Sequence, residues 1–309
     1  MTKWIRWAAA EGGTKASNSL ISKFIGVATG SFFGAVVASL VVAIIQMIGG
    51  LIGARVQRRS LSLMPQQFLG VIAFGTIATL MSWLIVYVFV FPDSDLGVVV
   101  FLISLSIIPG AFIDRLFFGQ PIRSHQWLGI TIFLLAGYAI LGFPSLYMLI
   151  NIPIWVIISL VLALLLAINE AITEFQAHFD AAELYPMVNN FWIGLTNVVL
   201  SVIAMMFLLD SFYQFKEFSL AFWAGSVTKG LLVLIMISFK LLSYQGGGTI
   251  ASKKLVMQGS YLILSTLIGA VIFIDESLTI GKILGMILFF IAFILTDERN
   301  WQNFTKRFY

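Results

Sequence analysis

The sequence contains no cysteine, only two histidines and few charged residues. Without cysteine there is no disulfide framework and no thiol chemistry. Asp, Glu, Lys and Arg make up 10% of the 309 residues, whereas soluble domains carry about 25%. His125 and His178 fall in or near predicted loops, and no acidic residues stand beside them at metal-ligand spacing. We therefore expect no metal, no other cofactor and no enzyme active site.

Apolar residues, in contrast, are abundant. They form 60% of the chain, and the mean hydropathy is +1.01. A helix that crosses the hydrocarbon core of a bilayer needs roughly 20 mostly apolar residues. Nine such runs are present: 24–52, 68–91, 96–118, 127–142, 152–176, 187–209, 218–242, 250–274 and 279–295. This pattern predicts an all-α integral membrane protein that lies in a lipid bilayer and has no nucleic-acid partner.

One stretch of the sequence occurs twice. The first copy is 117–122 followed by 126–129, and the second is 273–279 followed by 282–285. Gly129 aligns with Gly285 and Gln120 with Glu276, and both offsets (285 − 129 and 276 − 120) are 156 residues, about half the chain. The repeat predicts two five-helix halves, 1–150 and 151–309. Because five is odd, the halves are inverted relative to each other, an arrangement typical of secondary transporters.

The N-terminal segment 1–23 is too polar for a simple span. Arg6, Glu11 and Lys15 interrupt it, and each charge at mid-bilayer costs about 2.5–3.5 kcal/mol on insertion scales. The repeat places this segment opposite the span 152–176, which favours a degenerate first helix lodged against the bundle, with a Glu11–Lys15 pair lowering the cost. The alternative is a surface segment and only nine spans.

Basic residues predict the orientation. If the loop 55–67 is cytoplasmic and the spans alternate, only Lys23, Lys216 and Lys282 fall outside. The inside loops and ends then hold Lys3, Arg6, Arg55, Arg58, Arg59, Arg115, Arg123, Lys240, Arg299, Lys306 and Arg307. This asymmetry predicts that both termini are cytoplasmic. We expect the membrane to be a bacterial or archaeal inner (plasma) membrane.

The paired hairpins resemble those of the ten-helix, EamA-type branch of the drug/metabolite transporter superfamily. There, each half ends in a helix with proline or a small residue, a "flgE-r-l-t" hairpin, and a helix entered through "w-l-G". The matching pieces are 108–110, 117–122 and 126–129 in the first half, and 265–266, 273–279 and Gly285 in the second. The resemblance covers about 68–142 and 152–296. Gln120 stands where the family has glutamate.

This resemblance implies transport of a small molecule by alternating access, through a central cavity between the two halves. The spans expected to line that cavity correspond to the first to fourth and the sixth to ninth. The fifth and tenth, 127–142 and 279–295, form an outer scaffold or a homodimer surface. Export or proton exchange is the direction that the resemblance implies.

Ionisable residues within the spans are the candidate site residues, since such residues in membranes are usually functional. Glu170, beside Asn169, is a candidate for proton coupling or for binding a substrate amine; the alternative is a glutamate paired with lysine that stabilises the bundle. Lys229, near the middle of its span, is a candidate for binding a carboxylate or phosphate, or for pairing with Glu170.

Two polar stripes extend this set. Lys254, Gln258 and Tyr261 share one face of the ninth span and form a candidate cavity wall, although Lys254 also fits an anchor at the membrane interface. Asn190 and Asn197 form a second stripe, which either lines the cavity or bonds across helices.

Two further features concern packing. Trp83 is a candidate aromatic wall, with packing or a place in the interfacial aromatic belt as the alternative. Small residues at fourfold spacing on the run 24–52 predict close approach of another helix. They are Gly26, Gly30, Gly34 and Ala38.

These observations favour a secondary transporter for a small organic metabolite, either an amino-acid-like zwitterion or an organic anion, with proton coupling left open. One alternative is a carrier of nucleotide sugars or phosphorylated sugars that uses Lys229 and Lys254 as anion clamps. The other is a non-transporting membrane assembly or lipid-handling protein, which the polar first segment favours.

Overall fold

A computed structural model describes residues 3–118, 124–143, 152–179, 184–246, 250–273 and 276–296. Within these ranges the chain is helical and forms no strand. Among the described residues, six helical segments are long and apolar enough to cross a membrane: 32–56, 65–90, 96–117, 154–176, 186–206 and 220–245. Shorter apolar helices cover Trp127–Ile140, Val256–Ile272 and Ile280–Ala292. The prediction of an all-α, multi-pass membrane protein is therefore confirmed.

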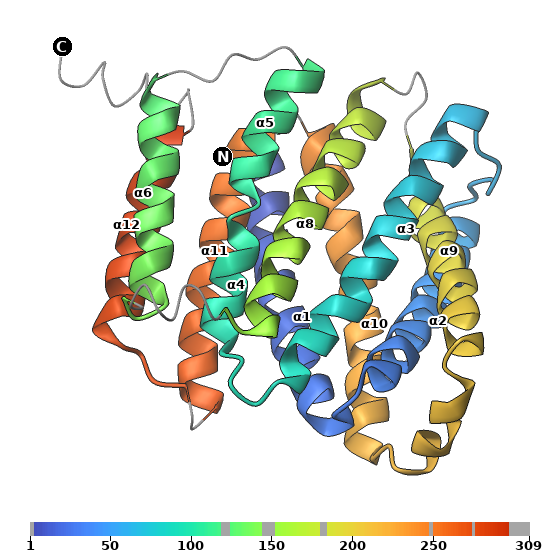
Figure 1. The fold of residues 1–309 in the computed structure, drawn as a ribbon. Coiled ribbons are helices and arrows are strands. Elements are labelled where there is room, and N and C mark those ends of the chain that lie inside the picture. The colour runs from blue at the N-terminus through green and yellow to red at the C-terminus, as the bar shows by residue number, and fades with distance from the viewer. Residues whose placement is uncertain are drawn as a thin grey trace.

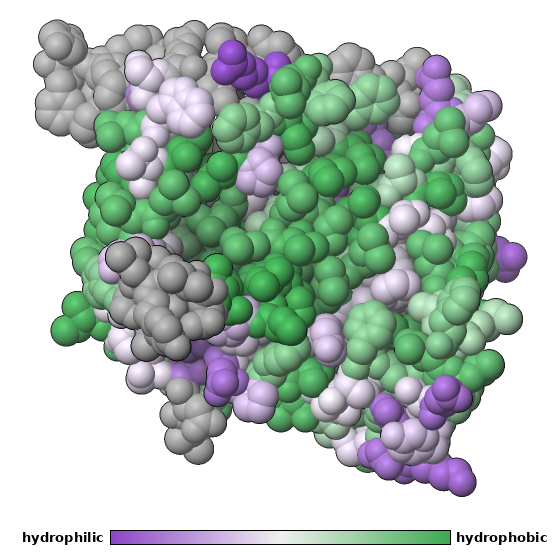
Figure 2. All heavy atoms as spheres, viewed as in Figure 1, coloured by the Kyte–Doolittle hydropathy of each residue, from purple (hydrophilic) through white to green (hydrophobic). Residues whose placement is uncertain are grey.

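Figure 1 shows the helices running side by side as one bundle. In chain order they are α1 (Lys3–Thr29), α2 (Phe32–Val56), α3 (Pro65–Tyr87), η1 (Val88–Val90), α4 (Leu96–Ser104), α5 (Ile107–Phe118), α6 (Ser124–Ile140), α8 (Ile154–Phe179), α9 (Pro186–Met206), η2 (Leu209–Lys216), α10 (Leu220–Gln245), α11 (Ile250–Ile272) and α12 (Ile280–Thr296). Apolar side chains cover the middle of the face in Figure 2, and polar ones gather towards its upper and lower edges.

The first helix is longer than the sequence predicts. We expected the first span to end near residue 23, but α1 continues to Thr29, and α2 begins at Phe32. The corner between them is Gly30, which adopts the left-handed φ of +60° that glycine tolerates best, and Ser31, whose side chain accepts a hydrogen bond from the Gly34 backbone N–H (3.1 Å). The predicted small-residue stripe is therefore split between two helices.

The span predicted at 96–118 is also broken, into α4 and α5. Pro109 lacks the N–H that would bond to the carbonyl of Leu105, and its ring crowds that carbonyl, so the helix is interrupted at residues 105–106. Gln258 of α11 supports the break: its side chain accepts a hydrogen bond from the Ser104 hydroxyl (3.1 Å) and donates one to the Ser106 hydroxyl (3.4 Å).

Helices from the two halves of the chain pack against each other throughout the bundle. The main neighbours are α2 with α9, α1 with α10 and α11, α3 with α8 and α9, and α4 with α11. Helices α6 and α12 pair at one edge (Figure 1). Their backbones are so close that a methyl group at Gly281 would lie 2.5 Å from the Ala139 carbonyl oxygen. Although α1 is polar, it is embedded in this bundle, with Ala8, Glu11 and Ala16 buried.

Candidate functional site

A cavity of about 130 Å³ lies inside the bundle. A single water needs about 10–15 Å³ of such space, so the cavity has room for a small organic molecule. Its lining comes from α1–α4 and α8–α11; α6 and α12 contribute none of the described lining residues. The lining is thus drawn from both halves of the chain.

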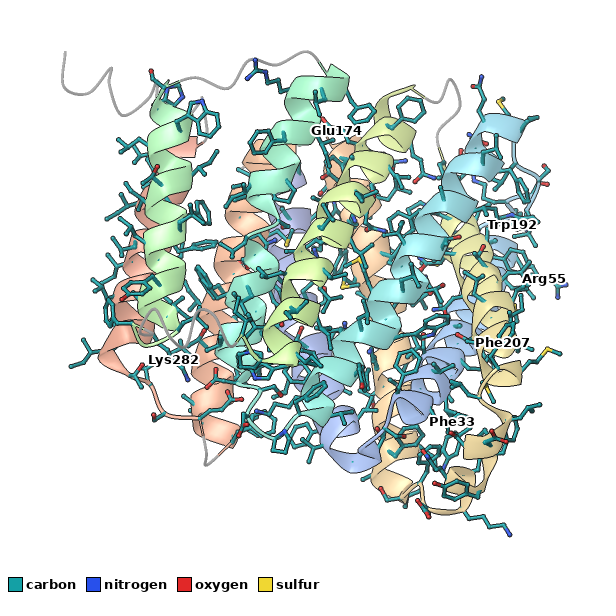
Figure 3. All side chains as sticks on the ribbon, in the orientation of Figure 1. Phe33, Arg55, Glu174, Trp192, Phe207 and Lys282 are labelled. Carbon is teal, nitrogen blue, oxygen red and sulfur yellow. The ribbon has the colours of Figure 1, made fainter. Side chains whose placement is uncertain are left out.

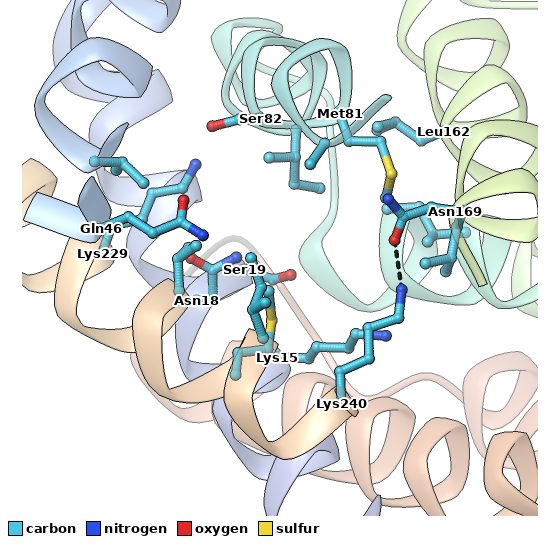
Figure 4. A pocket seen from close by; sticks show the side chains of 18 of the residues that line it. Lys15, Asn18, Ser19, Gln46, Met81, Ser82, Leu162, Asn169, Lys229 and Lys240 are labelled. Carbon is cyan, nitrogen blue, oxygen red and sulfur yellow. Dashed lines mark hydrogen bonds between the residues drawn. The ribbon is translucent and has the colours of Figure 1, made fainter. Parts of the chain in front are cut away.

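The charged groups that line the cavity are the lysines Lys15, Lys229 and Lys240 (Figure 4). Among the lining residues that the structure describes there is no aspartate or glutamate. Amide side chains of Asn18, Gln46, Asn169 and Asn197 supply further polar groups. The polar part of the described lining therefore consists of lysine, amide and hydroxyl groups.

Glu170 holds two of these lysines from behind the cavity. Its Oε1 lies 3.5 Å from Nζ of Lys15 and 3.1 Å from Nζ of Lys240, and its Oε2 accepts a hydrogen bond from the Tyr244 hydroxyl (2.6 Å). Lys15 also lies 3.1 Å from Glu11, one turn before it on α1. Both carboxylates are fully buried. This buried network joins α1, α8 and α10. It also gives Glu170 the lysine partners expected of a glutamate that stabilises the bundle.

Lys229 differs from the other two lysines. It is 1% exposed, and its amino group has no hydrogen-bond partner among the described residues. The alternative of a pair with Glu170 is not formed: Glu170 lies beside Lys240, and Lys229 is eleven residues, or about 16 Å, away from Lys240 along α10. An isolated buried charge in a membrane is unfavourable. The amino group of Lys229 therefore lacks a partner among the described residues and lies next to a space that can hold one.

The packing of α1 on α10 places Asn18 beside Lys229. The two helices run antiparallel, with contacts between Trp4 and Gly246, Trp7 and Phe239, and Ile25 and Gly225. This register puts Asn18 at the level of Lys229, as Figure 4 shows. Gln46 of α2 lies there too, since Gly230 packs against Ile45. The side-chain carbonyl oxygen of Asn18 is buried and has no hydrogen-bond partner among the described residues.

The opposite side of the cavity is apolar. It is formed mainly by α3, α4 and α8, and its apolar residues are Phe74, Ala78, Met81, Ile85, Ile103, Leu162 and Leu166. Ser82, which accepts a hydrogen bond from Ser39 (2.9 Å), is a polar exception. A molecule in this cavity would contact lysine and amide groups on one side and hydrocarbon on the other.

Three other predicted site residues line the cavity. Asn169 accepts a hydrogen bond from Lys240 (Figure 4). The Tyr261 hydroxyl is 2.6 Å from the Ser19 hydroxyl. Asn197 accepts hydrogen bonds from Ser39 (3.2 Å) and Ser201 (3.0 Å).

Other predicted residues are occupied with packing between helices. Asn190 accepts a hydrogen bond from Gln46 (2.9 Å) and donates to Ser238 (3.0 Å), so it joins α9 to α2 and α10. The Trp83 indole donates to Ser201 (3.2 Å) and packs edge-on against Phe32, and Gln258 supports the α4–α5 break. The side chain of Lys254 lies outside the described residues, as do Gln120 and the side chain of His178.

The sequence alone did not identify Lys240, Asn18, Ser19 or Gln46 as lining residues. Lys240 was assigned to a cytoplasmic helix end, but it is 4% exposed because α10 continues to Gln245. Asn18 and Ser19 were obscured by the polarity of the N-terminal segment. The signal was present in the sequence, since Asn18 shares a helical face with Glu11 and Lys15, but that face was interpreted as an internal pair that lowers the cost of insertion.

A second group of ion pairs lies away from the cavity. Glu276, the glutamate of the hairpin motif, pairs with Lys23 and accepts a hydrogen bond from the Leu96 backbone N–H (2.6 Å). Lys282 pairs with Asp95 (2.5 Å). These residues connect the α11–α12 hairpin to the start of α4, at the lower edge of Figure 3, where Lys282 is labelled; Glu174 marks the upper edge. Lys23 and Lys282, predicted to lie outside the membrane, are thus mostly buried in ion pairs.

No family model and no curated protein matches the sequence. Among solved structures, one described only as "Crystal structure of protein" superposes with a TM-score of 0.59. The match covers 92% of this chain and 95% of the other, at 14% sequence identity. At that identity the match shows a shared fold, which extends over nearly the whole of both chains.

Proposed function

We propose that this protein is a secondary transporter that moves a small organic metabolite, an anion or a zwitterion, by alternating access. The observation that carries the proposal is the cavity lined by lysine and amide groups from both halves of the chain, which includes Lys229, a lysine without a partner among the described residues. An unpaired charge within a membrane helix is destabilising, and such residues usually mark a functional site. A transported anion supplies the missing partner.

The helix bounds support ten spans in two inverted repeats. At the offset of 156 residues, Ser124–Ile140 (α6) superimposes on Ile280–Thr296 (α12) residue for residue. The contacts between helices repeat as well. In the proposed repeat, α1, α2 and α3 correspond to α8, α9 and α10. The contact of α1 with α10 then corresponds to that of α8 with α3, and the contact of α2 with α10 to that of α9 with α3. Such inverted repeats place a substrate site near the midplane, at their interface, and the lining of the cavity by helices from both halves of the chain supports such a site.

The same features support membership of the EamA-type branch of the drug/metabolite transporter superfamily. That resemblance implies a cavity lined by the first to fourth and sixth to ninth spans, and the lining helices α1–α4 and α8–α11 fit this expectation. The fifth and tenth spans correspond to α6 and α12, which pair at the edge of the bundle as a scaffold. The polar first segment no longer favours a non-transporting protein, because α1 supplies Lys15, Asn18 and Ser19 to the cavity.

Glu170 is the residue we propose for proton coupling. Its carboxylate holds Lys15 of α1 and Lys240 of α10, and it lies directly behind the cavity lining. A proton on Glu170 would remove the charge that attracts both lysines, and so loosen α1 and α10 from α8. Coupling predicts that a pH gradient drives uptake into proteoliposomes, and that Glu170→Gln transports at a rate independent of the gradient.

Ligand binding and transport test the proposal together. Purified protein in detergent is screened by thermal shift against amino acids, carboxylates, sugar phosphates, nucleotide sugars and cationic drugs at two pH values. A ligand at about a hundred times its Kd should add roughly 2.7 kcal/mol of stability. Each ligand that binds is then followed as a radiolabelled solute in counterflow across proteoliposomes.

The expected result is a shift for at least one anionic or zwitterionic class, together with counterflow of that solute. A matched control is Lys216→Met, which removes an exposed lysine of η2 outside the cavity and should change neither. A well-folded protein that binds and exchanges no solute in the panel would contradict the transporter proposal. Binding confined to cationic drugs would contradict the choice of solute.

A further inference from the structure

We infer that the site around Lys229 binds the carboxylate of a singly charged organic acid that has an apolar body and no ammonium group. This inference rests on the proposed function and narrows its substrate class. Three properties of the described lining lead to it. One lysine has no partner, no residue is acidic, and the wall is divided into a polar and an apolar part.

A single lining lysine, Lys229, lacks a partner among the described residues, and this indicates a single negative charge on the ligand. Lys15 lies 3.1 Å from Glu11 and 3.5 Å from Glu170, and Lys240 lies 3.1 Å from Glu170, so two carboxylates offset these two lysine charges. Lys229 has no partner among the described residues and can form an ion pair with one carboxylate. A phosphate with close to two negative charges and three acceptor oxygens needs several donors of positive charge. One free lysine therefore suits a carboxylate better than a phosphate.

The lining residues that the structure describes offer no carboxylate to pair with a substrate ammonium group. None of these residues is acidic, and the buried carboxylate behind them, Glu170, is held by Lys15, Lys240 and Tyr244. A zwitterion would bring its positive charge into this cavity and leave it without a carboxylate. Burying an unpaired charge is strongly unfavourable. The structure therefore favours an acid without an amino group over the corresponding amino acid.

The other walls of the cavity indicate the chemistry of the rest of the ligand. The apolar side formed by α3, α4 and α8 has few groups that could bond to hydroxyls of a sugar, and it suits an aliphatic or aromatic body. Beside Lys229, the carbonyl oxygen of Asn18 has no hydrogen-bond partner among the described residues. It can accept a hydrogen bond from a hydroxyl next to the carboxylate. An apolar hydroxy acid uses both groups.

Four compounds with the same branched body separate these possibilities: isocaproate, its hydroxy analogue leucate, leucine, and isopentyl phosphate. Binding to the full chain in detergent is measured by thermal shift and by competition against a labelled member of the series. We expect isocaproate and leucate to bind, leucate more tightly, and leucine and the phosphate to bind at least about tenfold more weakly. Lys229→Met should weaken isocaproate and leucate by about tenfold or more.

Two further variants keep the result interpretable. Lys229→Arg preserves the charge and should retain most of the binding that Lys229→Met loses. Asn18→Leu should abolish the preference for leucate over isocaproate without removing isocaproate binding. If Lys229→Met does not fold, Lys229→Gln takes its place.

The outcomes separate this inference from the proposed function. Tightest binding of leucine or isopentyl phosphate overturns the inference and leaves the transporter proposal intact. Carboxylate binding that Lys229→Met does not weaken overturns it too. If none of the four compounds binds but another solute undergoes counterflow, only the inference fails. Failure of the proposed function is a different result, namely the absence of binding and counterflow for every solute class.

Discussion

Helices α3 and α10 lie on opposite sides of the cavity, and they occupy equivalent places in the two proposed repeats. Both are long apolar helices that could cross a membrane. They differ in what they present: α3 contributes Phe74, Ala78, Met81, Ser82 and Ile85, whereas α10 contributes two lysines together with Val233, Met236 and Ile237. In the proposed repeat the two helices thus hold equivalent places but differ in chemistry, so that one wall of the cavity carries lysines and the facing wall is mainly apolar.

The two lysines of α10 give a second comparison, within one helix. Lys240 has Glu170 and Asn169 as partners, and Lys229 has none among the described residues. The same residue type therefore serves structure at one position and is available for a ligand at the other. A neighbouring carboxylate from another helix makes the difference.

The largest effect is expected from removing that carboxylate. Glu170→Gln leaves Lys15 and Lys240 buried without their shared charge partner, which should lower the free energy of unfolding by about 3–5 kcal/mol. Thermal or denaturant unfolding in detergent measures the change. Glu217→Gln, at an exposed position, is the matched control. Equal stability of the two variants would show that the buried network does not hold α1, α8 and α10 together.

Next in size is the contrast between the lysines themselves. Lys240→Met leaves Glu170 with one lysine fewer and should destabilise the protein by about 3 kcal/mol. Lys229→Met removes a buried amino group that has no partner among the described residues, and should stabilise the ligand-free protein by about 1–3 kcal/mol. Unfolding of both variants under identical conditions gives the comparison. Changes of the same sign would mean that Lys229 has a stabilising partner.

A smaller effect tests how firmly α1, which carries part of the cationic wall, is attached. Ser31→Ala removes the acceptor for the Gly34 N–H and the donor to Gln214 (2.6 Å). Loss of a helix N-cap typically costs about 1 kcal/mol. Hydrogen exchange should show faster opening near the end of α1 and the start of α2. Unchanged exchange in those segments would argue that the corner does not depend on the Ser31 side chain.

The smallest effect concerns the apolar wall. Ile103→Val removes one methylene from a residue that is 5% exposed and lines the cavity, at a cost of about 0.5–1 kcal/mol in stability. The space it leaves should shift ligand preference towards a body longer by one methylene. Competition between homologous carboxylates measures that preference. A preference that stays the same would place the ligand's body elsewhere in the cavity.

Several parts of this picture could be predicted from the sequence, and several could not. Lys229 was recognised as a candidate site residue because a lysine in the middle of an apolar run is rare and usually functional. Of the two alternatives for Lys229, the pairing with Glu170 is not formed, because Lys15 and Lys240 hold that carboxylate. The end of α1 was placed too early because its charges suggested a boundary that the corner at Gly30 and Ser31 actually sets. Lys240 was assigned to a helix end because helix bounds are uncertain by a turn.

The sequence by itself determined that this is an all-helical membrane protein. Length and apolar content of a span are properties of contiguous residues, and each helix satisfies its own backbone hydrogen bonds. The tertiary structure alone decided which charged residues are partnered. Glu170 meets Lys15 and Lys240 from helices far apart in the chain, and Lys229 meets no carboxylate among the described residues. Ion pairing depends on distances of a few ångströms between helices, and those distances arise only when the bundle packs.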